Sequence, residues 1–247
     1  MTQETQWVHT LASLGRGDLA RAGGKAANLG ELLRAGLPVP PGFAVLTAAY
    51  ECFVESNGLR AEIERHLGAG PLDAAERAAA AVRAAFAMGR LPREVEDAIL
   101  RGYRALGGGA VAVRSSATAE DLPEASFAGQ YESFLAVRGE PAVLAAVRSC
   151  WSSFFTARAV AYRARHGIDA RSVRLAVVVQ AMVPATVSGV LFTVDPVTGD
   201  PGRCVIEATW GLGEVLVGGQ VTPDAYTVNK SSGRIERAVI GDKRIQV

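Results

Sequence analysis

The sequence predicts an α+β fold of two lobes: a mixed α/β lobe over residues 1–181, then a β-rich, partial lobe over residues 182–247. Apolar residues recur at three- and four-residue spacing in consecutive segments between residues 59 and 106, which indicates amphipathic helices. After residue 182, short apolar runs alternate with the turn sequences DPVTGDPG and NKSSGR, which is typical of antiparallel strands. The stretch QAMVPATVSG is expected to connect the lobes.

In the first lobe, apolar periodicity and Gly or Pro punctuation divide the chain into successive elements. A helix that starts near Lys25 is expected to end at Gly36 in a left-handed conformation, before three prolines that forbid its continuation. Thr47 is expected to cap the next helix, which runs to about Asn57. The other expected helices are Leu59–Leu67, Leu72–Met88, Pro92–Leu106 and Glu140–His166, and the expected strands are Trp7–Leu14, Phe43–Leu46, Ala110–Val113, Tyr131–Val137 and Val173–Val179.

The second lobe is expected to hold short strands separated by turns. They are Gly189–Val194, Cys204–Thr209, Tyr226–Asn229 and a strand-like pattern in the last eight residues, IGDKRIQV.

Composition excludes several classes of protein. A formal net charge of +1 over 247 residues gives no electrostatic footprint for nucleic acid or an anionic membrane. The apolar runs are too short to span a bilayer, and MTQETQWVHT lacks the features of a signal peptide. Three widely spaced cysteines argue against a disulfide framework or a structural zinc site, and the three histidines lie in unrelated contexts. We therefore expect a reduced, cytoplasmic protein.

One loop has the character of an anion-binding site. The expected strand ends at Arg114, and small residues, including Ser115, Ser116 and Thr118, follow it. Such residues let backbone N–H groups approach an anion, and a guanidinium adds a bidentate clamp. Lys25, in GGKAANLG beside a helix start, would suit the same ligand, although the Walker A pattern is absent. The alternatives are a surface loop whose hydroxyls cap turns, and a solvated lysine.

Three other features have both a functional and an ordinary reading. Glu120 and Asp121 could hold a metal or act as an acid–base pair, but adjacent acids in a loop are more often solvated or cap a helix. Gln180 and the residues after it could hold a flat base at a strand end, or could simply end the strand. Glu214 could face a ligand or be a surface acid after a tight turn.

Read together, four stretches resemble one family: GGKAANLGELLRAGLPVPPGFAVLT, AVRSSATAEDLPEASFAGQYESFL, QAMVPATVSGVLFTVDPVTG and GLGEVLVGGQVTPDAY. They are similar to the N-terminal ATP-binding domain shared by phosphoenolpyruvate synthase, pyruvate phosphate dikinase and rifampin phosphotransferase. The resemblance runs from about Lys25 to Lys230. It implies an ATP-grasp-like fold and a phosphotransferase of the pyruvate, water dikinase type. Such an enzyme uses ATP and Mg²⁺ and passes the β-phosphoryl group to a histidine on a separate carrier domain.

The resemblance also implies roles for individual residues. Lys25 and Arg114 would hold the phosphates of ATP, and Gly129 would approach them through its backbone. Ser133 stands where relatives often carry Thr. The residues expected near the adenine are Gln180, Met182 and Val183.

The family's magnesium-binding glutamate, its carrier histidine and its acceptor-binding domain have no counterpart in the sequence, which we therefore expect to be a fragment with weak or no turnover alone. The acceptor expected by resemblance is pyruvate. The alternatives are the ATP-binding domain of a rifampin phosphotransferase, whose site would be the same, and a non-catalytic nucleotide-binding module.

Overall fold

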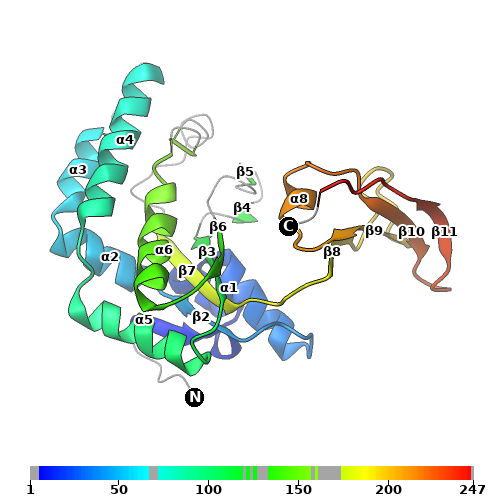
Figure 1. Cartoon of the computed structure of the whole chain (residues 1–247), viewed down its shortest axis with the longest axis horizontal. Helices are drawn as coiled ribbons and strands as arrows, with labels where there is room; N and C mark the ends of the chain where they lie inside the picture. The colour runs from blue at the N-terminus through cyan, green and yellow to red at the C-terminus, as the bar shows by residue number, and fades with distance from the viewer. Residues whose placement is uncertain are drawn as a thin grey trace. The chain divides into compact units, whose positions relative to one another are not determined.

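Helices and antiparallel sheets are combined in a chain that divides into two units, Met1–Met182 and Val183–Val247 (Figure 1). The structure, a computed structural model, describes residues 6–66, 72–118, 121–122, 125–126, 133–156, 159–160 and 174–245. This mixture of helix and antiparallel sheet confirms the predicted α+β class. Among the described residues, none of the helices has both the length and the apolar character needed to cross a membrane.

The first unit is organised by a five-stranded sheet with the order β1-β2-β7-β3-β6, in which all neighbours are antiparallel. The strands are β1 (Val8–Thr10), β2 (Gly42–Val45), β3 (Val111–Ala117), β6 (Ser133–Val137) and β7 (Leu175–Ala181). Strand β7, the last of these in the chain, lies between β2 and β3 and is almost fully buried. Two-residue strands β4 (Asp121–Leu122) and β5 (Ala125–Ser126) form a separate pair.

Two helical layers cover the opposite faces of this sheet. The larger layer contains α2 (Thr47–Ser56), α3 (Leu59–His66), α4 (Leu72–Met88), α5 (Arg93–Ala105) and α6 (Glu140–Ser153). Its core joins Phe53, Phe86 and Trp151 to Val113 and Val177 of the sheet. The centroid of the Phe53 ring lies 5.5 Å from that of Phe86 and 5.2 Å from that of Trp151, within the range of favourable aromatic pairs. Helix α1 (Leu19–Arg34) covers the other face through a smaller core that includes Ala22, Ala26 and Val178.

Most predicted elements of the first unit are confirmed within a few residues, but several details are wrong. Thr47 is the first residue of α2 rather than its cap, because Leu46 takes the cap position and no side chain caps the helix. The helix expected to reach His166 ends at Ser153, and residues 161–173 lie outside the described part. The prediction for Gly36 is confirmed by its φ of +77°.

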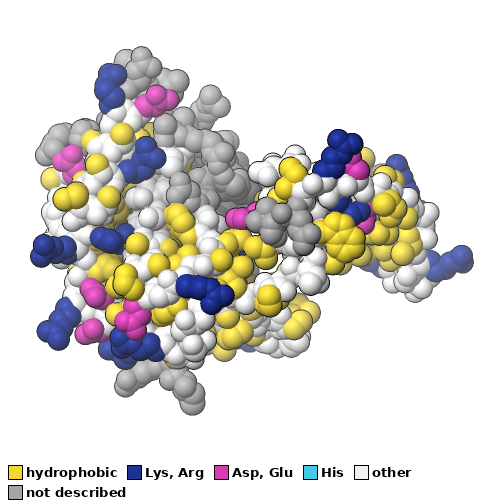
Figure 2. Space-filling view, viewed as in Figure 1, with side chains coloured by type: hydrophobic (Ala, Val, Ile, Leu, Met, Phe, Trp, Pro, Cys, Tyr) yellow, Lys and Arg dark blue, Asp and Glu magenta, His cyan; other side chains and the backbone are white. Residues whose placement is uncertain are grey.

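The second unit holds a four-stranded antiparallel sheet with the order β11-β10-β9-β8. Its elements are β8 (Val187–Phe192), β9 (Arg203–Trp210), the short helix α8 (Glu214–Val217), β10 (Asp224–Asn229) and β11 (Ile235–Val239). Both predicted hairpin turns are confirmed, since they join β8 to β9 and β10 to β11. The strand-like pattern expected at the end of the chain is wrong for residues 240–245, which contain no strand. Large apolar side chains gather on the surface of this unit, and Leu191 and Trp210 are 55% and 50% exposed (Figure 2).

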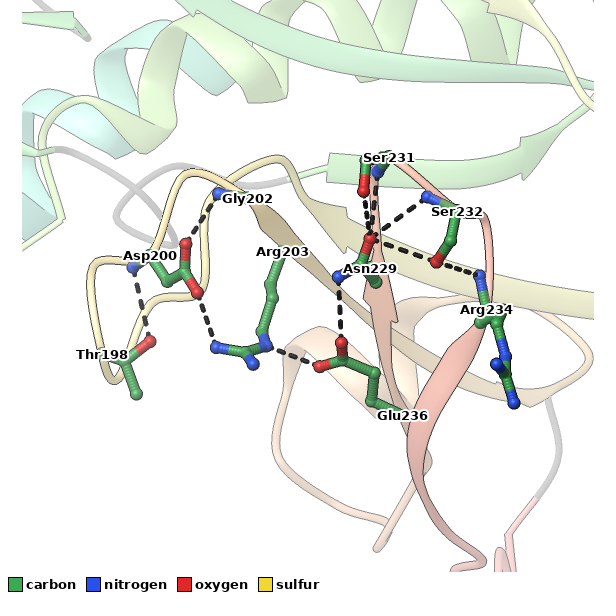
Figure 3. A network of polar contacts seen from close by, with 9 residues as sticks. All are labelled: Thr198, Asp200, Gly202, Arg203, Asn229, Ser231, Ser232, Arg234 and Glu236. Atoms are coloured by element: carbon green, nitrogen blue, oxygen red, sulfur yellow. Dashed lines mark hydrogen bonds and ion pairs between the residues drawn. The ribbon is translucent and has the colours of Figure 1, made fainter.

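A polar network fastens the two hairpin turns of the second unit to each other (Figure 3). The Arg203 guanidinium donates to Asp200 and to Glu236, at 2.6 Å in each case. Asn229 donates to Glu236 at 3.0 Å and accepts bonds from the backbone N–H groups of Ser231 and Ser232. These bonds from Arg203 and Asn229 hold the pKa of Glu236 below its ordinary value.

Truncating Phe86 should lower the free energy of unfolding by about 3–5 kcal/mol, because Phe86→Ala leaves a cavity in a fully buried aromatic cluster. Urea denaturation measures the change. Met88→Ala, two residues along the same helix and 84% exposed, is the matched control and should change the free energy little. An equal loss in both variants would contradict the packing described here.

Acid should weaken the hairpin network through Glu236. Because its folded-state pKa is lowered, its contribution is fully present above its ordinary value of 4.5 and is lost as the pH falls through the lowered value. Unfolding by urea at neutral pH and at about pH 3.5 should therefore show a smaller acid-induced loss in Glu236→Gln than in the unsubstituted chain. Glu207→Gln, which changes a side chain with no hydrogen bond or ion pair to any described residue, should leave the acid-induced loss unchanged.

Candidate functional site

Helix α1 is broken at Gly23, in the GGK sequence that contains the predicted phosphate ligand Lys25. Gly23 has φ +75° and ψ 170°, which is not helical, whereas the residues on both sides are. The break divides α1 into a short first segment and a second segment whose first turn contains Lys25. The helix start predicted near Lys25 is therefore confirmed as the start of the second segment. The preceding turn, from Leu19, was missed because a pair of glycines argues against a helix.

The break exists because α1 meets strand β3 at this point. A Cβ atom on Gly23 would lie 2.0 Å from the carbonyl oxygen of Ser116, so only glycine permits the contact. The Ser116 hydroxyl donates to the carbonyl of Ala22 at 2.8 Å and accepts from the N–H of Ala26 at 3.1 Å. One buried side chain thus satisfies a carbonyl at the end of the first segment and an amide at the start of the second.

Strand β3 continues three residues beyond the predicted end at Arg114. The prediction placed Ser115 and Ser116 in a loop because serines are uncommon inside strands, but both are buried and pair with Val177 and Ala176 of β7. Alternate residues of a strand face opposite sides of the sheet. Val113 and Ala117 belong to the larger core, so Arg114 and Ser116 face the side that α1 covers.

The strand register places three of the predicted ATP-binding residues on this same face. Ser133 of β6 lies directly opposite Arg114, and Val178 of β7 lies opposite Arg114 on its other side. Gln180 is two residues beyond Val178 and therefore also faces α1. The face of the sheet under α1 thus gathers side chains from three strands, with Lys25 in the helix above.

The guanidinium of Arg114 differs from the surface ion pairs of the unit. Arg114 is half-buried, yet its guanidinium makes no hydrogen bond or ion pair with any residue that the structure describes. Lys25 is also half-buried. By contrast, Arg104 is paired with Glu140 at 2.6 Å, and Arg174 with Glu51 at 2.9 Å. A half-buried guanidinium without a carboxylate partner in the described part is suited to an anionic ligand.

Gln180, predicted to lie near the adenine, is buried and its side chain is fixed by a hydrogen bond. Its side chain is 7% exposed, and its amide nitrogen donates to the carbonyl of Pro40 at 3.0 Å. The Met182 N–H donates to the carbonyl of Ala110 at 2.9 Å. Met182 ends the first unit, and Val183, 53% exposed, begins the second.

The remaining predicted features are Gly129, Glu120, Asp121 and Glu214. Gly129, the side chain of Asp121 and the whole of Glu120 lie outside the described residues. Glu214 is exposed at the start of the four-residue helix α8, as expected for a surface acid. In the described part of the chain, no three His, Cys, Asp or Glu side chains are grouped so that they could hold a metal ion.

An open pocket of about 850 Å³ lies elsewhere in the first unit, mainly among residues of α1 and α2. Its lining includes Trp7, Glu51 and Arg174 but none of the predicted site residues. Glu51 bonds both Arg60 and Arg174, so its charge is already compensated. The pocket therefore gives no reason to move the candidate site from the face under α1.

Comparison with known proteins identifies the family to which residues 19–247 belong. The family described as "Pyruvate phosphate dikinase, AMP/ATP-binding domain" matches residues 19–247, which include both units' described sheets apart from β1. The chain belongs to this family. The resemblance of the four quoted sequence stretches is thereby confirmed, and the break in α1 lies at the start of the AMP/ATP-binding domain.

Similar curated proteins carry consistent names. The chain is 45% identical over 249 residues to a probable phosphoenolpyruvate synthase of Methanothermobacter thermautotrophicus, covering 97% of this chain and 36% of the relative. It is 45% identical over 250 residues to the phosphoenolpyruvate synthase of Aeropyrum pernix, covering 97% and 30%. A probable phosphoenolpyruvate synthase of Staphylothermus marinus is 44% identical, with coverages of 99% and 31%. The chain therefore spans about a third of the length of these relatives.

Replacing Gly23 should destabilise the first unit more than replacing another glycine with positive φ. Gly23→Ala is expected to cost about 2–5 kcal/mol, because the new Cβ adds both left-handed strain and an overpacked contact with Ser116. Gly36→Ala, at φ +77° with open space around the added Cβ, should cost only about 1–2 kcal/mol. Urea denaturation compares the two, and equal costs would contradict the close approach of α1 to β3.

Proposed function

We propose that this chain binds MgATP on the α1 face of the first unit, as the nucleotide-binding part of a phosphoenolpyruvate synthase-like dikinase. The observation that carries the proposal is the break in α1, which sets the first turn containing Lys25 against the strand containing Arg114. Membership of an AMP/ATP-binding family supports a nucleotide as the ligand. The finer assignment to an ATP-grasp-like domain is part of this proposal and rests on the sequence motifs.

The proposed roles follow from charge and position. Lys25 and Arg114 hold the phosphate oxygens and stabilise the charge that develops on them during phosphoryl transfer. Ser133, opposite Arg114 in the register, adds a hydroxyl donor. Gly129 approaches the phosphates through its backbone.

The base is proposed to lie toward the C-terminal end of β7, at Gln180. There Gln180 keeps its carbonyl oxygen as an acceptor for the exocyclic amine of adenine, since its nitrogen is engaged with Pro40. Met182 and Val183 supply apolar contacts to the base.

Magnesium enters this proposal as part of the substrate. Mg²⁺ in nucleotide sites is held largely by phosphate oxygens and water, with one or two carboxylates. The phosphates of ATP and water are therefore proposed to supply most of its ligands here.

The proposed reaction requires groups beyond those described. ATP would be cleaved to AMP and phosphate, and the β-phosphoryl group would pass to a histidine of a carrier domain and then to pyruvate in an acceptor-binding domain. The names of the three relatives favour pyruvate over rifampin as the acceptor. Cytoplasmic location belongs to the same proposal.

Calorimetric titration of MgATP tests the binding site. Arg114→Ala should lower the affinity by about 1–3 kcal/mol, because a charge-assisted contact to phosphate is lost. Arg101→Ala, which removes an exposed arginine of α5, is the matched control and should bind like the unsubstituted chain. A folded chain that binds neither ATP, ADP nor AMP would contradict the proposal.

A further inference from the structure

We infer that Ser116 is a positioning residue for the proposed phosphate site, acting through the first turn that contains Lys25. This inference rests on the proposed function of the α1 face. Ser116 itself is fully buried, so its hydroxyl is not available to a ligand in this structure. Its two hydrogen bonds instead determine where the second segment of α1 begins relative to β3.

The Ser116 hydroxyl replaces hydrogen bonds that the broken helix has lost. At Gly23 the backbone leaves the helical conformation, so Ala22 lacks its usual intrahelical donor and Ala26 is near the start of a new segment. Buried backbone groups must be paired, and the Ser116 hydroxyl pairs one of each kind. Among the described residues, no other hydroxyl bonds to either group.

Ser116 also links the backbone segments that contain the two proposed phosphate-binding residues, Lys25 and Arg114. Ser116 is two residues after Arg114 on one face of β3, and its acceptor bond is to the residue immediately after Lys25. A bond of 3.1 Å from the Ala26 amide therefore fixes the backbone beside Lys25 to the strand of Arg114. Beyond Arg114, β3 pairs with β7 as far as Ala117 and contacts α1 at Ser116.

Comparison of Ser116 with Ser115 distinguishes an effect on the position of α1 from an effect on core packing. Ser115, the preceding residue, is equally buried but faces the larger core, because it pairs with Val177. A serine at 115 can contribute to stability without touching α1. Ser116 is thus expected to affect phosphate binding specifically, whereas Ser115 is not.

The experiment compares MgATP and adenosine binding to four versions of the 247-residue chain: unsubstituted, Ser116→Ala, Ser115→Ala and Ser116→Thr. Loss of the hydroxyl in Ser116→Ala should weaken MgATP binding about tenfold and leave adenosine binding unchanged. Ser116→Thr keeps the hydroxyl and should restore most of the MgATP affinity, and Ser115→Ala should bind both ligands normally. Circular dichroism confirms that each variant is folded.

A double-mutant cycle shows whether the effect passes through Lys25. If it does, adding Ser116→Ala to Lys25→Ala should weaken MgATP binding by much less than tenfold, because the displaced lysine is already absent. Additive losses, or equal losses for MgATP and adenosine, would overturn the inference. If the unsubstituted chain binds MgATP and Ser116→Ala binds it equally well, the inference fails and the proposed function stands. If the unsubstituted, folded chain binds no nucleotide, the proposed function fails first.

Discussion

The contact between helix α1 and strand β3 is the constraint on which the candidate site depends. The backbones approach so closely at Gly23 and Ser116 that a single Cβ atom would prevent the contact. The helix breaks to permit this approach, and the Ser116 hydroxyl pairs the backbone groups that the break exposes. One short contact thus explains the glycine at position 23, the buried serine and the position of Lys25.

Much of the fold follows from local patterns in the sequence. Helix α4 has its predicted bounds, and both hairpin turns join strands as their Gly, Pro and Asp residues indicate. Local patterns do not report pairing between distant segments. The extension of β3 through Ser115 and Ser116 depends on the ladder with β7, and the early end of α6 at Ser153 follows no glycine or proline signal.

Residue patterns predicted less of the candidate site than of the fold. A loop rich in small residues and one lysine indicated an anion only weakly, and resemblance to a family supplied the individual roles. The register that sets Ser133 and Gln180 on the face of Arg114 could not be predicted, because it depends on which strands become neighbours. Ser116 was predicted only as a loop hydroxyl. The paired glycines Gly23 and Gly24, in the helix that contacts Ser116, were the sequence signal that could have revealed this contact.

The central place of β7 also governs the order in which the first unit can form. This strand is the last of its sheet to be synthesised, yet it pairs with β2 and β3, which precede it by more than a hundred and by several tens of residues. Until residues 175–181 have left the ribosome, β2 and β3 each have one edge without its strand partner. The unit should therefore complete its sheet only after β7 has been synthesised, and should fold more slowly than its helical content suggests.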